Sequence, residues 1–333
     1  MRKEHQRLVI SLLISALIFT VLLVRTVTPE TVEAVRRMHA ANLLLILCIW
    51  LIDYTSDSVS IWLLSKESST GSISLRTAWG LTGLRNFFNV TTPFNSGGTP
   101  AVVYALGQHG IPYGEGLSIS LVRMFGISAW YFFFSLISAV MLFSRALHTD
   151  SVFFLGIGVF VLLAALVYIL IFLSCIQAKP LIVMSKGIYL IGKKTRIFKA
   201  DQVRRRILHE AFTVRRSIKA YFSRKKPLFF LAMGANCLAA AAQITLMVII
   251  LYALGIPQEQ TIDLFIRSSL LIFLMRFMPS PGGIGFAEGL YILLFADVVP
   301  IHMLGAAVVI WRVFLNYSKA AVGAVVFSSI YSR

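Results

Sequence analysis

The sequence predicts an all-α polytopic membrane protein with about six full transmembrane helices and two re-entrant hairpins in an inverted repeat. Hydrophobic residues make up 58% of the 333 residues and charged residues only 14%, whereas a soluble domain is nearer half apolar and a quarter charged. The apolar residues also gather in runs that can cross a hydrocarbon layer about 30 Å thick. Finally, two interrupted apolar segments occupy matching places in the two halves of the chain.

Six of the apolar runs are long enough to be full spans. The first follows a basic N-terminus and lacks a small-residue cleavage site, so we expect a retained helix rather than a signal peptide. We therefore interpret residues 1–333 as one integral membrane domain. The predicted spans are residues 8–25, 42–64, 117–144, 151–176, 228–254 and 300–328.

The net charge of +17 is concentrated in residues 177–227, where fifteen Lys and Arg face only two acidic residues. Because Lys and Arg favour cytoplasmic loops, we expect a protein of the cell membrane with this segment and both termini in the cytoplasm. Apolar residues recur at helical spacing over 207–222 and predict a basic amphipathic helix on the anionic inner leaflet. Strong basic charge can also indicate nucleic acid binding, but the apolar runs favour the membrane, and we expect no nucleic acid partner.

Two apolar segments, 77–109 and 262–297, are interrupted by proline and paired glycines. No continuous piece of either is a comfortable span, and these residues end helices and permit tight turns. We therefore predict two re-entrant hairpins, each entering and leaving by the same face. A full span at the first hairpin would place the basic segment outside, against its charge. The breaks fall at Pro93, Gly97 and Gly98, and at Pro281, Gly282 and Gly283.

The spans and hairpins repeat in order, giving one half at about 42–145 and a second at about 228–328. Under the predicted topology the two halves are inverted relative to one another. Interrupted helices at matching positions of inverted halves indicate the central binding site of a transporter. An arginine also precedes each break and another lies in the following span, at Arg85, Arg123, Arg276 and Arg312.

The predicted site binds an anion. Free N–H groups at a helix start attract anions, and guanidinium groups suit phosphate. A charge inside a span costs about 3 kcal/mol or more, so it needs either a ligand or an internal salt bridge, and the sequence leaves both open. Asp53 and Asp57, four apart on one helix face, and Glu288 are candidates for ion coupling. The predicted substrate-binding residues are Arg85, Asn89, Pro93, Gly97, Gly98, Arg123, Arg276, Pro281, Gly282, Gly283, Glu288 and Arg312.

We expect no catalytic residues, metal or cofactor. The sequence has no evident Ser/His/Asp set, and no Cys/His cluster has the spacing of metal ligands. It also lacks the Gly-x-x-x-x-Gly-Lys-Ser/Thr motif of ATP-binding loops. Transport would then be driven by an ion gradient, a partner or the lipid gradient.

Residues 278–288 read Met-Pro-Ser-Pro-Gly-Gly-Ile-Gly-Phe-Ala-Glu. This string resembles the Pro-x-x-Gly-Gly-x-Gly-x-x-Glu signature of the lysylphosphatidylglycerol synthase transmembrane-region family, also called flippase-like domain proteins. The resemblance extends over nearly the whole chain. Thr99 and Pro100 stand where family members often have an acidic residue after the first glycine pair. Further similar positions are Asn89, Thr92, Pro93, Gly97 and Gly98 in the first half and Arg312, Tyr317 and Gly323 in the second.

In fuller members of this family, a soluble aminoacyltransferase domain moves lysine from charged tRNA to phosphatidylglycerol, and the membrane region translocates the product. The only long soluble stretch here is about 50 residues, below the usual size of a domain, so we expect no lysyl transfer. The resemblance implies a translocase for a phospholipid or a polyprenyl-phosphate-linked lipid. The alternatives are a phosphatidylglycerol lysyltransferase-type enzyme and a non-transporting partner of a lipid-glycan enzyme docked through 177–227. The sequence also leaves a homo-oligomer open.

Overall fold

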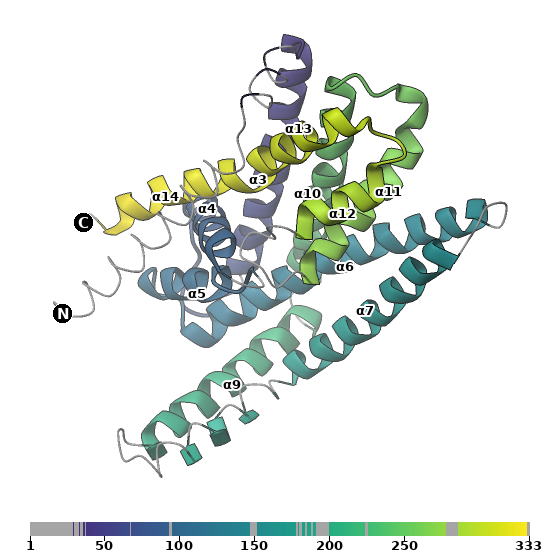
Figure 1. Cartoon of the computed structure of the whole chain (residues 1–333). Helices are drawn as coiled ribbons and strands as arrows, with labels where there is room; N and C mark the ends of the chain where they lie inside the picture. Colours follow the sequence, from purple (N-terminus) through teal and green to yellow (C-terminus); the bar gives the residue numbers. More distant parts are fainter. Residues whose placement is uncertain are drawn as a thin grey trace.

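The structure is a computed structural model, and it is built of helices (Figure 1). No strand occurs in the part of the chain that it describes. The predicted first span, 8–25, and the second break with Pro281, Gly282 and Gly283 lie outside the described residues, as does Pro93. The described residues are 29, 33, 36, 38–66, 68–92, 95–146, 152–177, 179, 182–183, 185–187, 189–190, 200–223, 226–277 and 286–331.

Among the described residues, four helical segments are long and apolar enough to cross a membrane, which confirms an all-α polytopic membrane protein. Three of them lie in the continuous helices α3 (Ala40–Ser65), α6 (Tyr113–Ala146) and α10 (Lys226–Ala253). The fourth, Met303–Val325, runs through α13 and α14. Large apolar side chains along α7 (Val152–Ile176) are exposed, as expected for a helix that faces lipid rather than water.

The last predicted span, 300–328, differs in its interior from a continuous α-helix. It consists of α13 (Ile301–Arg312), a π-helical turn η5 (Val313–Tyr317) and α14 (Ser318–Tyr331). The turn begins directly after the buried Arg312. Such π-helical insertions often occur at functional sites, and the apolar pattern of residues 300–328 did not predict this one.

Both interrupted segments form pairs of short helices. The first pair is α4 (Leu75–Thr91) and α5 (Gly98–Gln108), and α5 packs against α4. Helix α4 begins where the Ser74 hydroxyl accepts a hydrogen bond from the Thr77 N–H at 3.1 Å. A short 3-10 helix η2 (Gln258–Gln260) precedes the second pair. That pair is α11 (Thr261–Leu274), extended by the 3-10 turn η3 (Met275–Phe277), and α12 (Phe286–Phe295). The entry of each pair into the membrane from one face stays a prediction.

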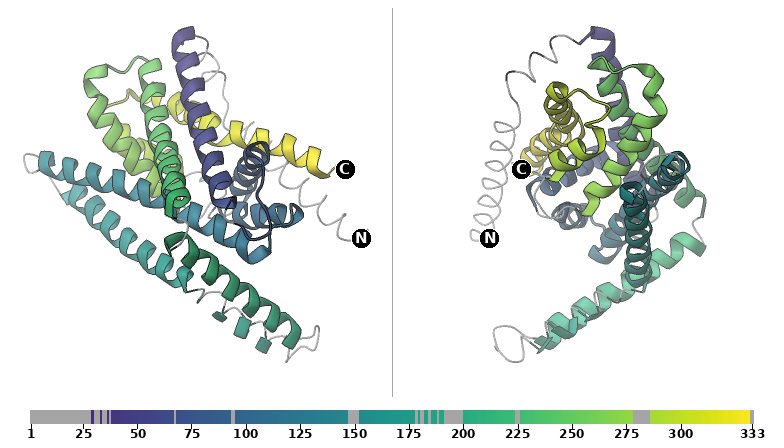
Figure 2. Two further views of the ribbon diagram at one scale, coloured as in Figure 1. Left: turned by 180° about the vertical axis from the view of Figure 1, so that it is seen from behind. Right: turned by 45° about the vertical axis from the view of Figure 1, so that its right-hand side comes forward.

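The helices of the two halves exchange contacts in a reciprocal way. Helix α3 packs along α10, and the early part of α10 shares a core cluster with the late part of α3, so the two run in opposite directions (Figure 2). Helix α4 packs against α14 of the other half, and α11 packs against α6. The first helix of each pair therefore packs against the last predicted span of the opposite half.

The crossing of α4 and α14 depends on two facing glycines. A Cβ atom on Gly323 would overlap the carbonyl oxygen of Gly83, and one on Gly83 would lie 2.8 Å from the Gly323 Cα atom. Small residues allow such close helix contacts in membranes. We expect Gly323→Ala to lower the free energy of unfolding by about 1–3 kcal/mol, the usual cost of overpacking. Gly305→Ala on α13 is the matched control, because no described neighbour lies within 4 Å of its added Cβ. Equal melting temperatures of the two purified variants would contradict the close crossing.

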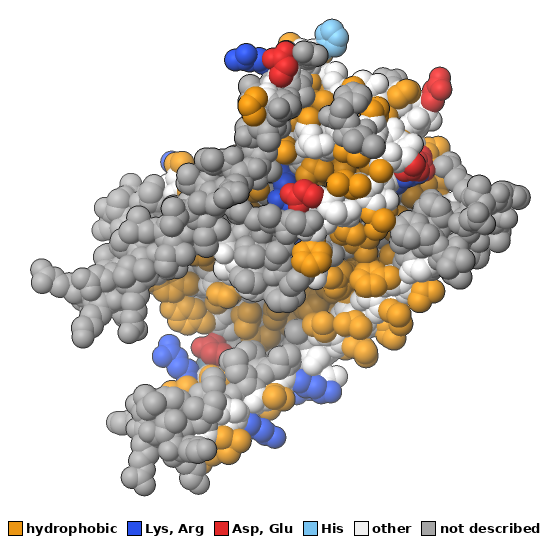
Figure 3. All heavy atoms as spheres, in the orientation of Figure 1, with side chains coloured by type: hydrophobic (Ala, Val, Ile, Leu, Met, Phe, Trp, Pro, Cys, Tyr) orange, Lys and Arg blue, Asp and Glu red, His pale blue; other side chains and the backbone are white. Residues whose placement is uncertain are grey.

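Helix α9 (Ala200–Ser223) is the predicted basic amphipathic helix. Its buried face, which includes Val214 and Ile218, packs against the neighbouring helices, mainly α6. The Tyr221 hydroxyl donates a hydrogen bond to the Leu64 carbonyl at the end of α3, at 2.9 Å. The apolar face is therefore used partly for packing within the protein, while Phe212 stays exposed. Figure 3 shows Lys and Arg side chains along α9 in the lower part of the view, and hydrophobic side chains of other helices above them. Contact with the inner leaflet stays a prediction.

Candidate functional site

Helix α3 places two carboxylates in the interior of the helix bundle. Asp53 and Asp57 lie one turn apart on the same face, as the spacing predicted, and both are buried. Each carboxylate is bound by cations from other helices. The internal salt bridges that the sequence left open are therefore present, and they divide the charged residues into separate groups.

Asp57 binds two of the predicted arginines at once. The Nε atom of Arg123, on α6, donates to Asp57 Oδ1 at 2.6 Å. Arg85, on α4, forms an ion pair with Asp57 Oδ2, and its Nη1 atom lies 3.4 Å from Oδ1. Both arginines are buried. Two cations thus share one anion, which leaves one net positive charge on this triad.

Asp53 is the start of a longer chain of polar side chains. Lys319, on α14, pairs with Oδ2 of Asp53, and Gln243 Nε2, on α10, donates to Oδ1 at 3.0 Å. Tyr131, on α6, donates its hydroxyl to Gln243 Oε1. The guanidinium group of Arg276 lies over the Tyr131 ring, 4.5 Å from its centroid, in a cation–π contact. This chain joins α14, α3, α10, α6 and η3.

Arg312 and Glu288 pair with each other. Arg312 is 1% exposed, and its Nη2 atom donates to Glu288 Oε2 at 3.1 Å. Glu288 lies in the first turn of α12, so the pair connects α12 to α13. Arg276 is exposed, in contrast to the other three arginines. The four arginines therefore occupy three places rather than one.

The residues of the first break hold the start of α5 against the end of α4. Asn89 Oδ1 accepts a hydrogen bond from the Gly98 N–H at 2.9 Å, and Thr92 Oγ1 accepts one from the Gly97 N–H at 2.8 Å. A Cβ atom on Gly98 would lie 2.5 Å from the Arg85 Cγ atom, so only glycine permits this approach. The helix begins at Gly98 with Gly97 as its N-cap. The approach of these glycines to a lipid stays a prediction.

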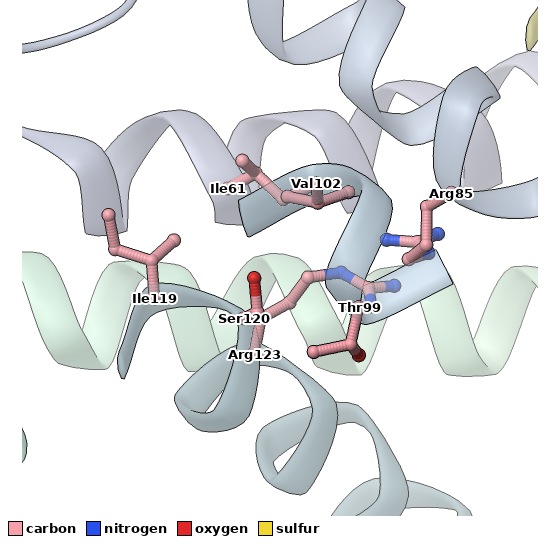
Figure 4. A pocket seen from close by; sticks show the side chains of 7 residues that line it. All are labelled: Ile61, Arg85, Thr99, Val102, Ile119, Ser120 and Arg123. Carbon is pink, nitrogen blue, oxygen red and sulfur yellow. The ribbon is translucent and has the colours of Figure 1, made fainter. Parts of the chain in front are cut away.

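A recess with about 260 Å³ of empty space, part of it open to the surroundings, lies beside the Asp57 triad (Figure 4). It lies between α3, α4, α5 and α6. Arginine side chains and hydroxyl groups share its wall with aliphatic side chains, which suits a ligand that is partly charged and partly apolar. Its lining residues are Ile61, Arg85, Thr99, Val102, Ile119, Ser120 and Arg123.

Several of these residues were absent from the predicted site. Lys319 could have been found, because it is a charged residue in an apolar run and such residues default to functional hypotheses. Gln243, Tyr131 and Ser120 carry no charge, and no sequence signal separates them from other polar residues of a span. Their grouping depends on how α6 and α10 pack against α3.

Residues 8–323 match a family model described as "Lysylphosphatidylglycerol synthase TM region". The match covers nearly the whole chain and includes the Gly-rich signature at 278–288. No curated protein matches the sequence.

Proposed function

Because the chain belongs to the lysylphosphatidylglycerol synthase transmembrane-region family, we propose that it moves a phosphate-bearing lipid between the two leaflets of the membrane. The substrate is a phospholipid or a polyprenyl-phosphate-linked lipid. One observation carries the proposal: Arg85 and Arg123 converge inside the bundle at the wall of a recess. Ionisable groups at such positions are costly and usually serve a function.

The triad with Asp57 suits a phosphate. Guanidinium groups bind phosphate oxygens through paired hydrogen bonds. The net positive charge of the triad favours binding of an anion over binding of a neutral molecule such as water. Asp57 keeps both guanidinium groups at the wall of the recess while no lipid is bound. Arg276, exposed above Tyr131, adds a further cation that a headgroup can reach.

The reciprocal packing of the helices supports an inverted repeat. Helices α3 and α10 run in opposite directions, and each hairpin contacts the last span of the other half. Rocking of inverted halves around a fixed site is the usual basis of alternating access. The Asp53–Lys319 pair joins α3 of the first half to α14 of the second. A movement of one half relative to the other would therefore change the distance between these two side chains.

The basic helix α9 supports the proposed orientation. It contacts the end of α3 through Tyr221 and the start of α6 through Ser118, whose Oγ lies 3.3 Å from the Val214 carbonyl oxygen. The positive-inside rule assigns these helix ends to the cytoplasm. We therefore propose that 177–227 and the chain termini lie on the cytoplasmic side, where α9 is near anionic headgroups.

Reconstitution into vesicles that contain fluorescently labelled phosphatidylglycerol tests the proposal. We expect a dithionite-accessible fraction above that of empty vesicles, and a rate about tenfold lower for Arg276→Ala, the loss expected for one charged contact. Arg76→Ala, at the exposed start of α4, is the control and should transport normally. No movement of labelled phosphatidylglycerol or of a labelled polyprenyl phosphate would refute the translocase.

The family description names a synthase, so the same preparation should also be incubated with lysyl-tRNA and unlabelled phosphatidylglycerol. Under the proposed function, extracted lipid contains no new aminoacyl product. Formation of lysylphosphatidylglycerol by this chain alone would replace translocation by lipid modification.

A further inference from the structure

We propose that the recess selects lipids whose headgroup carries one net negative charge, and that Ser120 donates a hydrogen bond to the lipid phosphodiester. This inference rests on the proposed function, to which it adds the class of substrate and a binding residue. Neither the charged residues of the sequence nor the family match identifies Ser120.

Ser120 provides the first observation. The residue is 7% exposed, and its Oγ atom has no hydrogen-bond partner in the described part of the chain. Figure 4 shows this hydroxyl pointing into the recess, beside Arg123. A buried hydroxyl without a partner is unfavourable, and each one in a native protein calls for an explanation. An acceptor oxygen on a ligand in the recess supplies the missing partner.

Ser118 shows that buried serine hydroxyl groups on α6 do not all lack a hydrogen-bond partner. It is buried in the same turn of α6, but its Oγ atom donates to the Gly114 carbonyl oxygen at 2.8 Å. Buried serines in membrane helices commonly satisfy their hydroxyl in this way, on the preceding turn. The Ser120 hydroxyl points into the recess instead.

The charge of the recess provides the second observation. Arg85 and Arg123 share the single carboxylate of Asp57, so the triad keeps one positive charge. A phosphodiester carries one negative charge and neutralises it. Of the described residues that line the recess, none is acidic, so the ammonium group of a zwitterionic headgroup would find no counter-ion there. Phosphatidylglycerol is therefore preferred over phosphatidylcholine.

The apolar wall of the recess agrees with a lipid. Ile61, Val102 and Ile119 form the apolar part of the wall and suit the glycerol carbons. Because α3 and α6 are candidate membrane spans, membrane lipid is the source of phosphate nearest to the recess.

The test is a lipid titration of the full chain in detergent, followed by native mass spectrometry. The ligands are dioleoylphosphatidylglycerol, dioleoylphosphatidylcholine and glycerol phosphate. We expect the wild type to bind phosphatidylglycerol several-fold more tightly than phosphatidylcholine. Ser120→Ala should weaken phosphatidylglycerol binding about tenfold, as expected for a hydrogen bond to a charged group. Ser118→Ala should leave the affinity unchanged, because its hydroxyl is bound within the protein.

Thermal unfolding without lipid separates binding from folding. Ser120→Ala should melt at or above the wild-type temperature because it removes an unpaired buried hydroxyl, whereas Ser118→Ala should melt lower. Wild-type affinity of Ser120→Ala for phosphatidylglycerol would overturn the role of Ser120. Equal binding of the two phospholipids would overturn the charge selectivity, and binding of glycerol phosphate as tight as that of phosphatidylglycerol would assign a soluble ligand. Vesicle transport is measured separately, so normal transport alongside any of these results would refute this inference and leave the translocase standing.

Discussion

Replacing Asp57 by Ala is expected to lower the free energy of unfolding by about 3–5 kcal/mol, the range measured when one partner of a buried ion pair is removed. Asp57 is 1% exposed and is the shared counter-ion of Arg85 and Arg123. The substitution leaves two guanidinium groups inside the bundle without this carboxylate. Thermal unfolding of the purified protein, together with the yield of monodisperse protein, measures the loss.

Asp297→Ala is the matched control for Asp57. The Asp297 side chain is 63% exposed, and its partner Arg267 also forms an ion pair with Asp263 at 2.7 Å. Exposed pairs contribute little because water and salt screen them, so we expect a loss of about 1 kcal/mol or less. Similar melting temperatures for Asp57→Ala and Asp297→Ala would contradict the burial of the Asp57 triad.

Replacing Lys319 by Met is expected to have an effect of similar size, also about 3–5 kcal/mol. Lys319 is the cation paired with the buried Asp53, and the substitution leaves that carboxylate with the Gln243 amide alone. A double variant, Lys319→Met with Asp53→Asn, removes the unpaired charge but keeps a side chain that can hydrogen-bond to Gln243. We therefore expect the double variant to recover most of the lost stability.

A double-mutant cycle measures this recovery. The unfolding free energies of the wild type, the two single variants and the double variant give the coupling between the two sites, which for residues in direct contact is commonly about 0.5–3 kcal/mol. We expect a value above this range, because each single variant leaves one buried charge and the double variant leaves none. Additive effects of the two substitutions would show that Lys319 and Asp53 are not paired in the folded protein.

Several features of the fold could be predicted because they are local properties of the chain. The length of an apolar run decides whether a helix can cross the membrane, and this identified α3, α6 and α10. Proline and paired glycines end helices, and the break between α4 and α5 ends at Gly97, directly before the first residue of α5, Gly98. The signature at 278–288 identified the family. Each of these conclusions needs only a window of neighbouring residues.

The candidate site could be predicted only in part. The sequence identified Arg85, Arg123 and Asp57 as charges that need a partner or a ligand, but not that they bind one another. The sequence of an apolar run does not indicate which of several carboxylates a given cation will pair with in the folded protein. For the same reason, the division of the arginines among Asp57, Tyr131 and Glu288 could not be read from spacing.

By itself, therefore, the sequence determined that this is a helical membrane protein with interrupted segments and charges inside its apolar runs. The free-energy cost of placing these residues in lipid or water depends on the chain alone. The tertiary structure decided which charges pair and where a recess with an orphan hydroxyl remains. Both depend on contacts between α3, α4, α5 and α6, which are separated in sequence and meet only when the helices pack.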